Sequence, residues 1–428
     1  METINHYIEQ ANHILKEVKT SKIMNKLQLN SINKLTEINI PTRKVESWKN
    51  TNLTTLLKNN YEVDLSQTLP NEKTKNPIQQ QIADDTAGCS HLYFLNGEFQ
   101  DSISEASALN IIDLKDVSEQ ELSTYIELID SDLKDDFSFH LNIASHKNGK
   151  LLRLDKDITL DKPIVIHHHY DKSAIQSNPF NIFHIGKSSK LDILEIYTSS
   201  EKSNALINPF HLILTESQAE FKHTLLQNCS LDTVFLNCLQ ASIKGEGQYK
   251  NINIHLGCEL SRSYNIATLL EENAFTAVHG LYPLNGKQHH DTLAKIHHQA
   301  PKTYSEQLYK GIVADESKGI FTGKVLIDQI AQESDSKQLN KNLILSSKAH
   351  AFSRPQLEIY ADDVKCAHGS TTGQLSEEEL FYFMARGISK DKAQQLLTTA
   401  FANDVVLKIE HLLIQRYISE QLNLKEYL

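Results

Sequence analysis

Cysteine and histidine stand two residues apart in the stretch DDVKCAHGSTTGQL, residues 362–375. If this stretch is a β-strand, alternate side chains point to one face, so Cys366 and His368 share a face about 6.6 Å apart. A thiolate and an imidazole both suit iron or zinc, and sulfur favours iron–sulfur chemistry. Two ligands do not complete a tetrahedral site, so a functional site would need further ligands from distant parts of the chain or from a second subunit.

A structural role for the same pair is the alternative. Cys366 would then be a small buried hydrophobic residue and His368 a strand-end histidine with a backbone partner. The segment GSTTG, which begins at Gly369, is typical of a turn and predicts that the strand ends at His368. Spacing alone leaves both interpretations open.

A second group of candidate ligands lies in KQHHDTLAKIHHQAP, and it consists of His289, His290, Asp291, His297 and His298. Paired histidines with an aspartate suggest a non-haem iron or zinc site. Adjacent histidines on a strand point to opposite faces, however, so at most one of each pair can face a given site. Structural or surface histidines are the alternative, and the HHH run at 167–169 predicts a strand that lies partly in solvent.

Composition excludes several classes of function. The 428-residue chain carries a net charge of −11 and has no basic stripe, which argues against nucleic acid as a partner. No apolar run approaches the roughly eighteen residues that cross a bilayer, and the polar N-terminus has no signal-peptide core, so we expect a cytoplasmic protein without a membrane partner. Phosphate loops of the GxxxxGK[ST] type, GxGxxG and GxSxG are absent, so ATP chemistry would have to come from another chain.

Cysteine usage points the same way. The five cysteines occur without a CxxC pair, which fits reduced thiols better than a disulfide framework. The spacing also argues against a self-contained four-cysteine metal site. Any metal chemistry must therefore be sparse or shared between chains.

The pattern of apolar and polar residues changes along the chain and divides it into regions. The chain reads as largely helical up to about position 60, and LYFLNGEF predicts a β-hairpin that turns at Asn96-Gly97. From about residue 150, short strands alternate with small polar corners near 187, 217, 246 and 272, so the repeating unit is about 26 to 30 residues. Such a unit predicts a stack of about eight β-rungs, a rod near 40 Å long, although a β-sandwich would give a similar texture.

The β texture stops at Leu375, where Ser376 and Glu379 have the spacing of a helix-capping box. Amphipathic helices follow to about residue 421, and Gly387 is placed to end the first of them. We therefore predict three regions: a helical and mixed N-terminal region at 1–145, a β core at 146–375 and a C-terminal helical domain at 376–428.

The residues of several of these segments resemble one family. DDVKCAHGSTTGQLSEEELFYFMARGI closely resembles the signature of the SufB/SufD family of iron–sulfur cluster assembly proteins, and KGIFTGKVLID also resembles it. PTRKVESWKNTNL and LYFLNGEF resemble the SufD branch, and the scarcity of cysteines favours that branch over SufB. The resemblance runs from about residue 40 to the end of the chain.

This resemblance implies a right-handed parallel β-helix between N-terminal and C-terminal helical regions. It implies a non-enzymatic scaffold subunit that pairs with SufB and binds the ATPase SufC through helices from Ser376 to about Gln421. It places Cys366 and His368 at a SufB–SufD interface that holds a transient iron–sulfur cluster, with His368 the first ligand candidate and Cys366 the second. A flavin in the complex and a homodimer in isolation stay open.

Two departures from the family pattern are visible. Asn50 replaces an aromatic residue in WKNT, which affects local packing, and the altered histidine segment at 289–298 receives no family role. The alternative functions are a stand-alone His-rich metalloenzyme and a SufB-type scaffold that accepts sulfur on Cys229, Cys238, Cys258 or Cys366.

Overall fold

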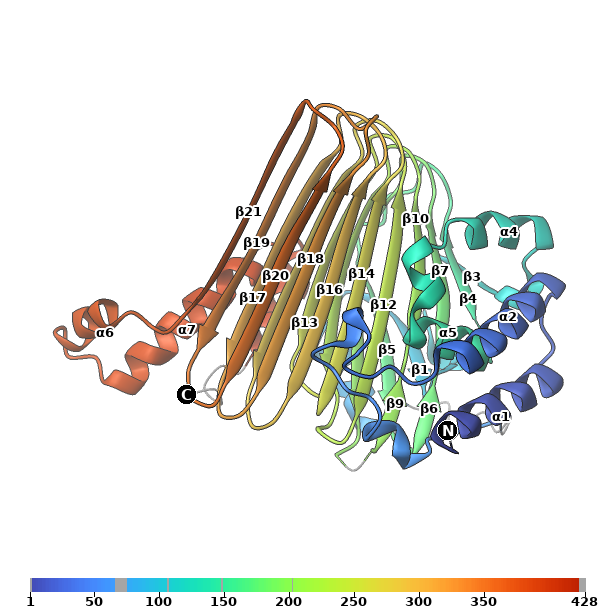
Figure 1. The fold of residues 1–428 in the computed structure, drawn as a ribbon, viewed down its shortest axis with the longest axis horizontal. Coiled ribbons are helices and arrows are strands. Elements are labelled where there is room, and N and C mark those ends of the chain that lie inside the picture. The colour runs from blue at the N-terminus through green and yellow to red at the C-terminus, as the bar shows by residue number, and fades with distance from the viewer. Residues whose placement is uncertain (1, 66–74, 106–107, 148, 202, 423–428) are drawn as a thin grey trace.

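The computed structural model describes residues 2–65, 75–105, 108–147, 149–201 and 203–422. Successive coils of the chain stack into a parallel β-solenoid of about eight turns, with helices at both ends of the chain (Figure 1). The predicted mainly β fold, with a parallel β-helix core flanked by N-terminal and C-terminal helical regions, is confirmed. Val234 is in register with Leu260, 26 residues on, which agrees with the predicted repeat, whereas Lys318 is in register with His350, 32 residues on, so the last coils are slightly longer than predicted.

Two sheets form the walls of the solenoid, and all pairs between successive coils are parallel. In spatial order, sheet B consists of β2 (Glu98–Phe99), β1 (Ser90–Leu95), β5 (Ile164–Tyr170), β8 (Lys190–Ser199), β11 (Glu220–Asn228), β13 (Gln248–His255), β15 (Phe275–Leu284), β17 (Tyr304–Val313), β19 (Ser334–Ile344) and β21 (Val364–Gly373). Sheet A consists of β20 (His350–Ile359), β18 (Lys318–Ile327), β16 (His289–His298), β14 (Leu260–Leu269), β12 (Val234–Ile243), β10 (Phe210–Thr215), β7 (Phe180–Ile185), β4 (Lys150–Leu154) and β3 (Asn110–Asp113). The short strands β6 (Ile175–Ser177) and β9 (Ala205–Ile207) pair beside β12.

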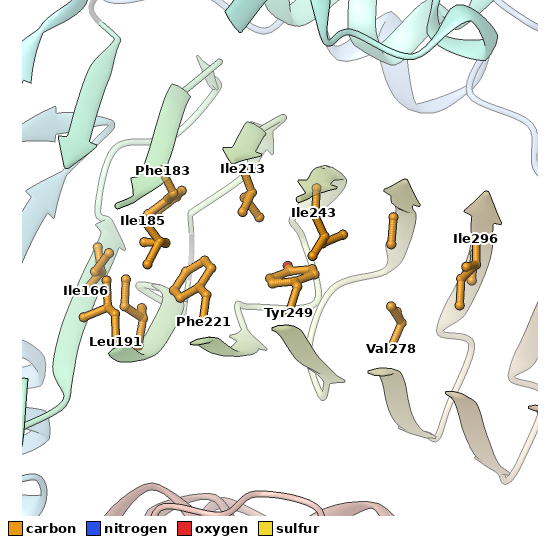
Figure 2. Packing of buried hydrophobic residues seen from close by; sticks show 14 of the residues in the cluster. Ile166, Phe183, Ile185, Leu191, Ile213, Phe221, Ile243, Tyr249, Val278 and Ile296 are labelled. Atoms are coloured by element: carbon orange, nitrogen blue, oxygen red, sulfur yellow. The ribbon is translucent and has the colours of Figure 1, made fainter. Parts of the chain in front are cut away.

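The interior of the solenoid is filled from both sheets. Figure 2 shows Ile185, Ile213 and Ile243 of sheet A facing a row from sheet B that includes Phe221 and Tyr249. Because the same position recurs once per coil, apolar side chains stack into columns that exclude water along the rod. Each fully buried side chain of this size stabilises the fold by about 1.5–3 kcal/mol.

The corners between strands carry the predicted polar residues. Ser188, Gln218, Glu246 and Asn273, one in each of the four predicted corners, all have a positive φ between 57° and 62°. Backbone hydrogen bonds join one corner to the next, for example Gln218 N to Gly245 O at 3.0 Å. Short polar segments therefore mark the places where the chain turns from one strand to the next.

Eight α-helices and five 3₁₀ turns belong to the described part of the chain. The helices are α1 (Glu2–Glu17), α2 (Lys22–Ile38), α3 (Pro77–Asp85), α4 (Glu119–Glu127), α5 (Phe137–Ser145), α6 (Glu377–Met384), α7 (Lys390–Val406) and α8 (Leu412–Gln421). The 3₁₀ turns are η1 (Glu46–Trp48), η2 (Leu56–Asn59), η3 (Asp101–Ile103), η4 (Leu114–Asp116) and η5 (Ser131–Asp135). No helix among the described residues is long and apolar enough to cross a membrane.

The helices cover opposite outer faces. Apolar residues of α2 and α5, such as Met24 and Phe139, pack on the outer face of sheet A. Apolar residues of α7 and α8, such as Val405 and Ile418, pack on the outer face of sheet B. Ion pairs Lys222–Glu410 at 2.9 Å and Lys408–Glu306 at 2.8 Å lie between the C-terminal segment and sheet B.

The two ends of the solenoid differ. At the N-terminal end, β1 and β2 form the predicted hairpin through Asn96 and Gly97, both with positive φ, and β3 pairs antiparallel with β4. At the other end, β21 is the last strand of sheet B and β20 is the last strand of sheet A. The C-terminal end of the solenoid therefore presents two edge strands, while α6 projects away from it (Figure 1).

Candidate functional site

Cys366 and His368 lie on β21, the terminal strand of sheet B. Cys366 is in register with Ser336 of β19 and His368 with Gln338, so the predicted strand with both residues on one face is confirmed. The predicted turn after His368 is wrong, because β21 continues to Gly373. Hydrogen bonding to β19, whose Leu339 is in register with Gly369, holds this glycine-containing segment extended.

The thiol of Cys366 points toward the interior of the last rungs. It is half-buried and packs against a small apolar cluster formed by Val325, Ile327, Ala331 and Ala361. Burial raises the pKa of the Cys366 thiol, and the Asp335 carboxylate raises it further, although the backbone N–H of Ser336 opposes them. The free thiol is therefore protonated at neutral pH, and a bound metal would have to displace that proton.

The imidazole of His368 is exposed, unlike the interior side chains of earlier rungs. One rung below it, Gln338 is buried and its Nε2 donates to Gln307 Oε1 at 2.8 Å. Gln338 Oε1 is buried and has no hydrogen-bond partner among the described residues. Gln338 therefore offers a buried acceptor in register with His368, but no hydrogen bond joins the two side chains in the described structure.

β20 and β21 are edge strands, so one side of each has no strand partner among the described residues. β20 and β21 are ten residues each, and Ser370 Oγ donates to Ser353 Oγ at 2.7 Å between them. Phe352, Ile359 and Tyr360 expose apolar surface on or next to β20. A long edge with exposed apolar side chains is a template for pairing with another chain.

The five residues of the second candidate group are not brought to one site, although Thr51 Oγ1 bonds both His289 and Asp291. His290 faces the interior, where Ser261 and Thr292 are its partners, and His298 pairs with Thr303 and Ser305. The other three residues are engaged elsewhere: His289 Nε2 lies 3.0 Å from Thr51, His297 Nε2 lies 3.0 Å from Asp328, and Asp291 accepts from Arg262 at 2.6 Å. Within the described ranges, no group of three or more His, Cys, Asp or Glu side chains has the arrangement of a metal site.

Near the N-terminal end of the solenoid, three interior histidines surround one buried carboxylate, that of Glu195. Glu195 of β8 accepts at 2.9 Å from Tyr197 OH and lies 2.9 Å from the Nε2 atoms of His168, His211 and His223. The three imidazoles and the carboxylate have no solvent exposure. We call Glu195, His168, Tyr197, His211 and His223 the Glu195 cluster.

The neighbouring histidines keep the carboxylate of Glu195 ionised. Burial alone would raise its pKa, but His211, His168 and His223 together hold it well below the ordinary value. The carboxylate is therefore ionised and has four polar groups around it, as a buried anion requires. Burial lowers the pKa of His168, which Glu195 only partly offsets.

The sequence did not predict the Glu195 cluster, and the prediction for one of its histidines, His168, is wrong. The prediction that the HHH run at 167–169 lies partly in solvent is wrong, because all three residues are buried. His168 meets Glu195, while His167 Nε2 lies 3.1 Å from His91 Nδ1 on the other face of the strand. A glutamate in the otherwise apolar run ILEIY was the one available signal.

Three of the other four cysteines are less accessible than Cys366. Cys229, Cys238 and Cys258 are buried, and Cys89 is half-buried. Burial raises the pKa of Cys89 to about 11 and those of Cys238 and Cys258 well above their usual range. Thiolates at Cys238 and Cys258 are therefore strongly disfavoured, which weakens a sulfur-accepting role for them.

Comparison with known proteins identifies the class to which this solenoid and its terminal rung belong. Residues 168–401 match the SufBD core domain of SUF-system iron–sulfur cluster assembly proteins, and residues 1–166 match the SufBD N-terminal region. The chain belongs to the SufBD family of the SUF system for iron–sulfur cluster assembly.

Three relatives illustrate the family. A SufBD family protein of Synechocystis is 30% identical over 338 residues, 75% of this chain and 74% of that protein. The iron–sulfur cluster assembly protein SufD of Escherichia coli is 24% identical over 387 residues, 87% of this chain and 86% of that protein. Protein ABCI7, chloroplastic, of Arabidopsis thaliana is 30% identical over 234 residues, which cover 54% of this chain and 49% of that protein.

Proposed function

We propose that the chain is the SufD-type scaffold subunit of a cytoplasmic SufB–SufC–SufD complex that assembles iron–sulfur clusters and transfers them to apoproteins. The observation that supports this most strongly is the unpaired terminal rung, which carries a thiol and an exposed imidazole at the edge of the solenoid. A subunit of the same fold could continue both sheets there and bring further ligands. The cluster is the cargo of this complex.

Within that interface, His368 is the first ligand candidate and Cys366 the second. The exposed His368 can be reached by a partner without rearrangement of the rung. Use of Cys366 requires loss of a proton that burial holds on the thiol, and the side chain would leave its apolar contacts. Ligands from SufB would complete a site that this chain supplies only in part.

The C-terminal helices are the proposed docking surface for SufC, which would supply the ATPase activity of the complex. In this proposal the docking surface belongs to the C-terminal helical domain at 376–428, which follows the N-terminal region at 1–145 and the β core at 146–375. α7 and α8 pack on sheet B, whereas α6 exposes Phe381, Tyr382 and Met384, with Phe381 70% exposed. Aromatic and methionine side chains are common anchors of protein interfaces. This chain itself would be non-catalytic.

The proposal has two further components, a flavin and a homodimer. A flavin would act as an electron donor in the complex, and no residue of this chain is assigned to it. A homodimer of the isolated chain would use the same open end, since two edges of one kind can pair when SufB is absent.

Co-expression with SufB and SufC candidates tests the proposal. The complex should purify intact with both wild-type chain and His368→Ala, while anaerobic absorption shows several-fold less cluster with the variant. His350→Ala is the matched control, because His350 is also an exposed histidine at an edge strand. Normal cluster yield from His368→Ala would reject His368 as a ligand, and failure of any complex to form would reject the scaffold role.

The SufC surface is tested by Phe381→Lys. A lysine in the centre of the exposed α6 surface should lower SufC recovery at least about tenfold, as expected for an aromatic anchor. SufB recovery should not change. Leu231→Lys, at a solenoid corner where Leu231 is 58% exposed, is the control for an added surface charge. Equal loss of SufC from both variants, or from neither, would contradict this docking surface.

A further inference from the structure

Two cysteines of successive coils meet at one corner of the solenoid. Cys229 directly follows β11, Cys258 lies shortly after β13, and these two strands pair in parallel. The backbone N–H of Cys258 donates to Cys229 O at 3.2 Å. Adjacent strands lie about 4.8 Å apart, which falls within the Cα separation of about 4.4–6.8 Å that a disulfide requires.

Gly257 lets the two segments approach each other closely. A β-carbon at this position would lie 1.9 Å from Cys229 O and 2.7 Å from Cys229 N, so a larger residue does not fit. Gln227 Oε1 accepts from Gly257 N at 3.2 Å, and Gln227 Nε2 donates to Cys258 Sγ at 2.6 Å. One side chain therefore holds both the backbone of the corner and the sulfur of Cys258.

The surroundings of the two thiols are apolar. Both side chains belong to one buried cluster with Tyr170, Tyr197 and Phe235. Burial raises the pKa of the Cys258 thiol well above its usual range, and the neighbouring Cys229 thiol adds to the effect. The cluster therefore accepts neutral sulfur, as a thiol or a disulfide, and disfavours a thiolate or a charged metal–thiolate complex.

The other three cysteines lie in separate apolar clusters. Cys238 packs with Phe210 and Ile266, while Cys89 and Cys366 pack against two further clusters. Cys229 and Cys258 are therefore the two cysteines of the described chain that share one cluster.

We propose that Cys229 and Cys258 form a disulfide between two coils when a peroxide is present. One sulfur attacks a peroxide oxygen, the O–O bond breaks, and a sulfenic acid and water form. The second sulfur attacks the sulfenic sulfur, the S–O bond breaks, and a second water leaves with the remaining thiol proton. The two sulfurs together lose the two electrons that reduce the peroxide.

The bond stabilises the solenoid without rearranging it. It closes a loop of 28 intervening residues and so restricts the unfolded chain. The folded corner already brings the two cysteines together, so the far-ultraviolet circular dichroism should not change on oxidation. This pair is separate from the terminal Cys366–His368 rung and does not depend on the scaffold role.

Peroxide treatment of the full-length Cys238→Ala chain tests the proposal. Trypsin releases Cys229 and Cys238 in one peptide, 223–244, and Cys258 in another, 251–262, so this substitution makes the assignment unambiguous. Hydrogen peroxide is added to the folded chain, and catalase removes it before denaturation and alkylation. Mass spectrometry should show the two peptides linked in most chains, and dithiothreitol should separate them. The same treatment of the urea-unfolded chain should give mixed pairings.

Thermal unfolding measures the effect of the bond. Peroxide should raise the Tm of the wild-type chain by about 3 °C, and dithiothreitol should reverse the rise. Cys229→Ser and Cys258→Ser should each abolish the rise. Cys89→Ser, which removes a cysteine outside the pair, is the matched control and should retain it. Circular dichroism checks that each variant is folded.

Three outcomes would overturn the proposal. Recovery of both peptides unlinked and alkylated, from folded chains in which peroxide has oxidised Cys366, would show that the two thiols do not react with each other. A link from Cys258 to a cysteine other than Cys229 would assign the bond to a different pair. A rise in Tm that persists in a folded Cys229→Ser variant would place the stabilising oxidation elsewhere in the chain.

Discussion

The Glu195 cluster and the Cys366–His368 rung place histidines on the same kind of solenoid strand, but in opposite states. In the cluster, Glu195 has three imidazoles and a tyrosine hydroxyl around it, and the carboxylate and imidazoles have no solvent exposure. In the terminal rung, His368 is exposed, and β21 is the last strand of sheet B in the described part of the chain. Where neighbouring coils enclose the rung, the histidines bind a buried carboxylate, and where the rung ends the solenoid, the histidine is exposed to a partner.

This comparison predicts two opposite rankings. Substitutions should lower the free energy of unfolding most in the Glu195 cluster and least at His368. Loss of cluster assembly by the proposed complex should follow the reverse order among the folded variants.

The largest loss of stability is expected for Glu195→Ala. Removal of the carboxylate leaves His168, His211 and His223 buried without their acceptor, and loss of one partner from a buried charged network costs about 3–5 kcal/mol. Urea unfolding measures the change. Thr124→Ala, at an exposed position of α4, is a control that should cost less than about 0.5 kcal/mol. A loss below about 1 kcal/mol for Glu195→Ala would show that the cluster contributes little to stability.

The next effect depends on pH and concerns His255. Burial lowers the pKa of His255 to about 3, and neither ring nitrogen has a hydrogen-bond partner within the described residues. Because the folded-state pKa is depressed, the neutral ring contributes stability above the unfolded pKa near 6.5, and this contribution is lost as the pH falls toward 3. Between pH 7 and pH 5 the loss is about 2 kcal/mol.

His255→Leu should remove that part of the pH dependence. Urea unfolding at pH 7 and pH 5 should show a smaller decline for the variant than for the wild-type chain, by about 2 kcal/mol. Thr124→Ala is the control, since its exposed side chain does not titrate in this range and should leave the decline unchanged. Equal declines for His255→Leu and the wild-type chain would mean that His255 becomes protonated in the folded protein.

The difference between the two regions also explains what the sequence could predict. The corners near 187, 217, 246 and 272 were predictable because polar residues that tolerate a left-handed backbone recur once per coil. The shared face of Cys366 and His368 followed from strand alternation. Both features depend on local sequence or on a regular repeat.

The errors came from contacts between coils. Each histidine of the HHH run meets a residue of another strand: His167 meets His91, His168 meets Glu195 and His169 meets Thr198. The local sequence contains no sign of these partners. GSTTG reads as a turn, but pairing with β19 extends it. The Arg262–Asp291 pair was missed for the same reason, since its members lie on different coils, β14 and β16.

A smaller loss of stability is expected for Cys366→Ala. The sulfur is half-buried against the apolar cluster around Val325 and Ile327, so its removal should cost about 1 kcal/mol in urea unfolding. Cluster assembly should fall less than with His368→Ala, because Cys366 is the second ligand candidate. A larger loss of cluster with Cys366→Ala than with His368→Ala would reverse the proposed order of the two ligands.

The smallest loss of stability should belong to His368→Ala. Its imidazole is exposed and packs in no apolar cluster of the described structure, so truncation should change the free energy of unfolding by less than about 0.5 kcal/mol. The same variant should cause the largest loss of cluster in the assembled complex. A measured loss of stability as large as that of a buried polar group that has lost its partner, about 2 kcal/mol, would mean that His368 has a structural partner like the histidines of the Glu195 cluster. The difference between a completed and an incomplete rung would then no longer separate structural from functional histidines in this fold.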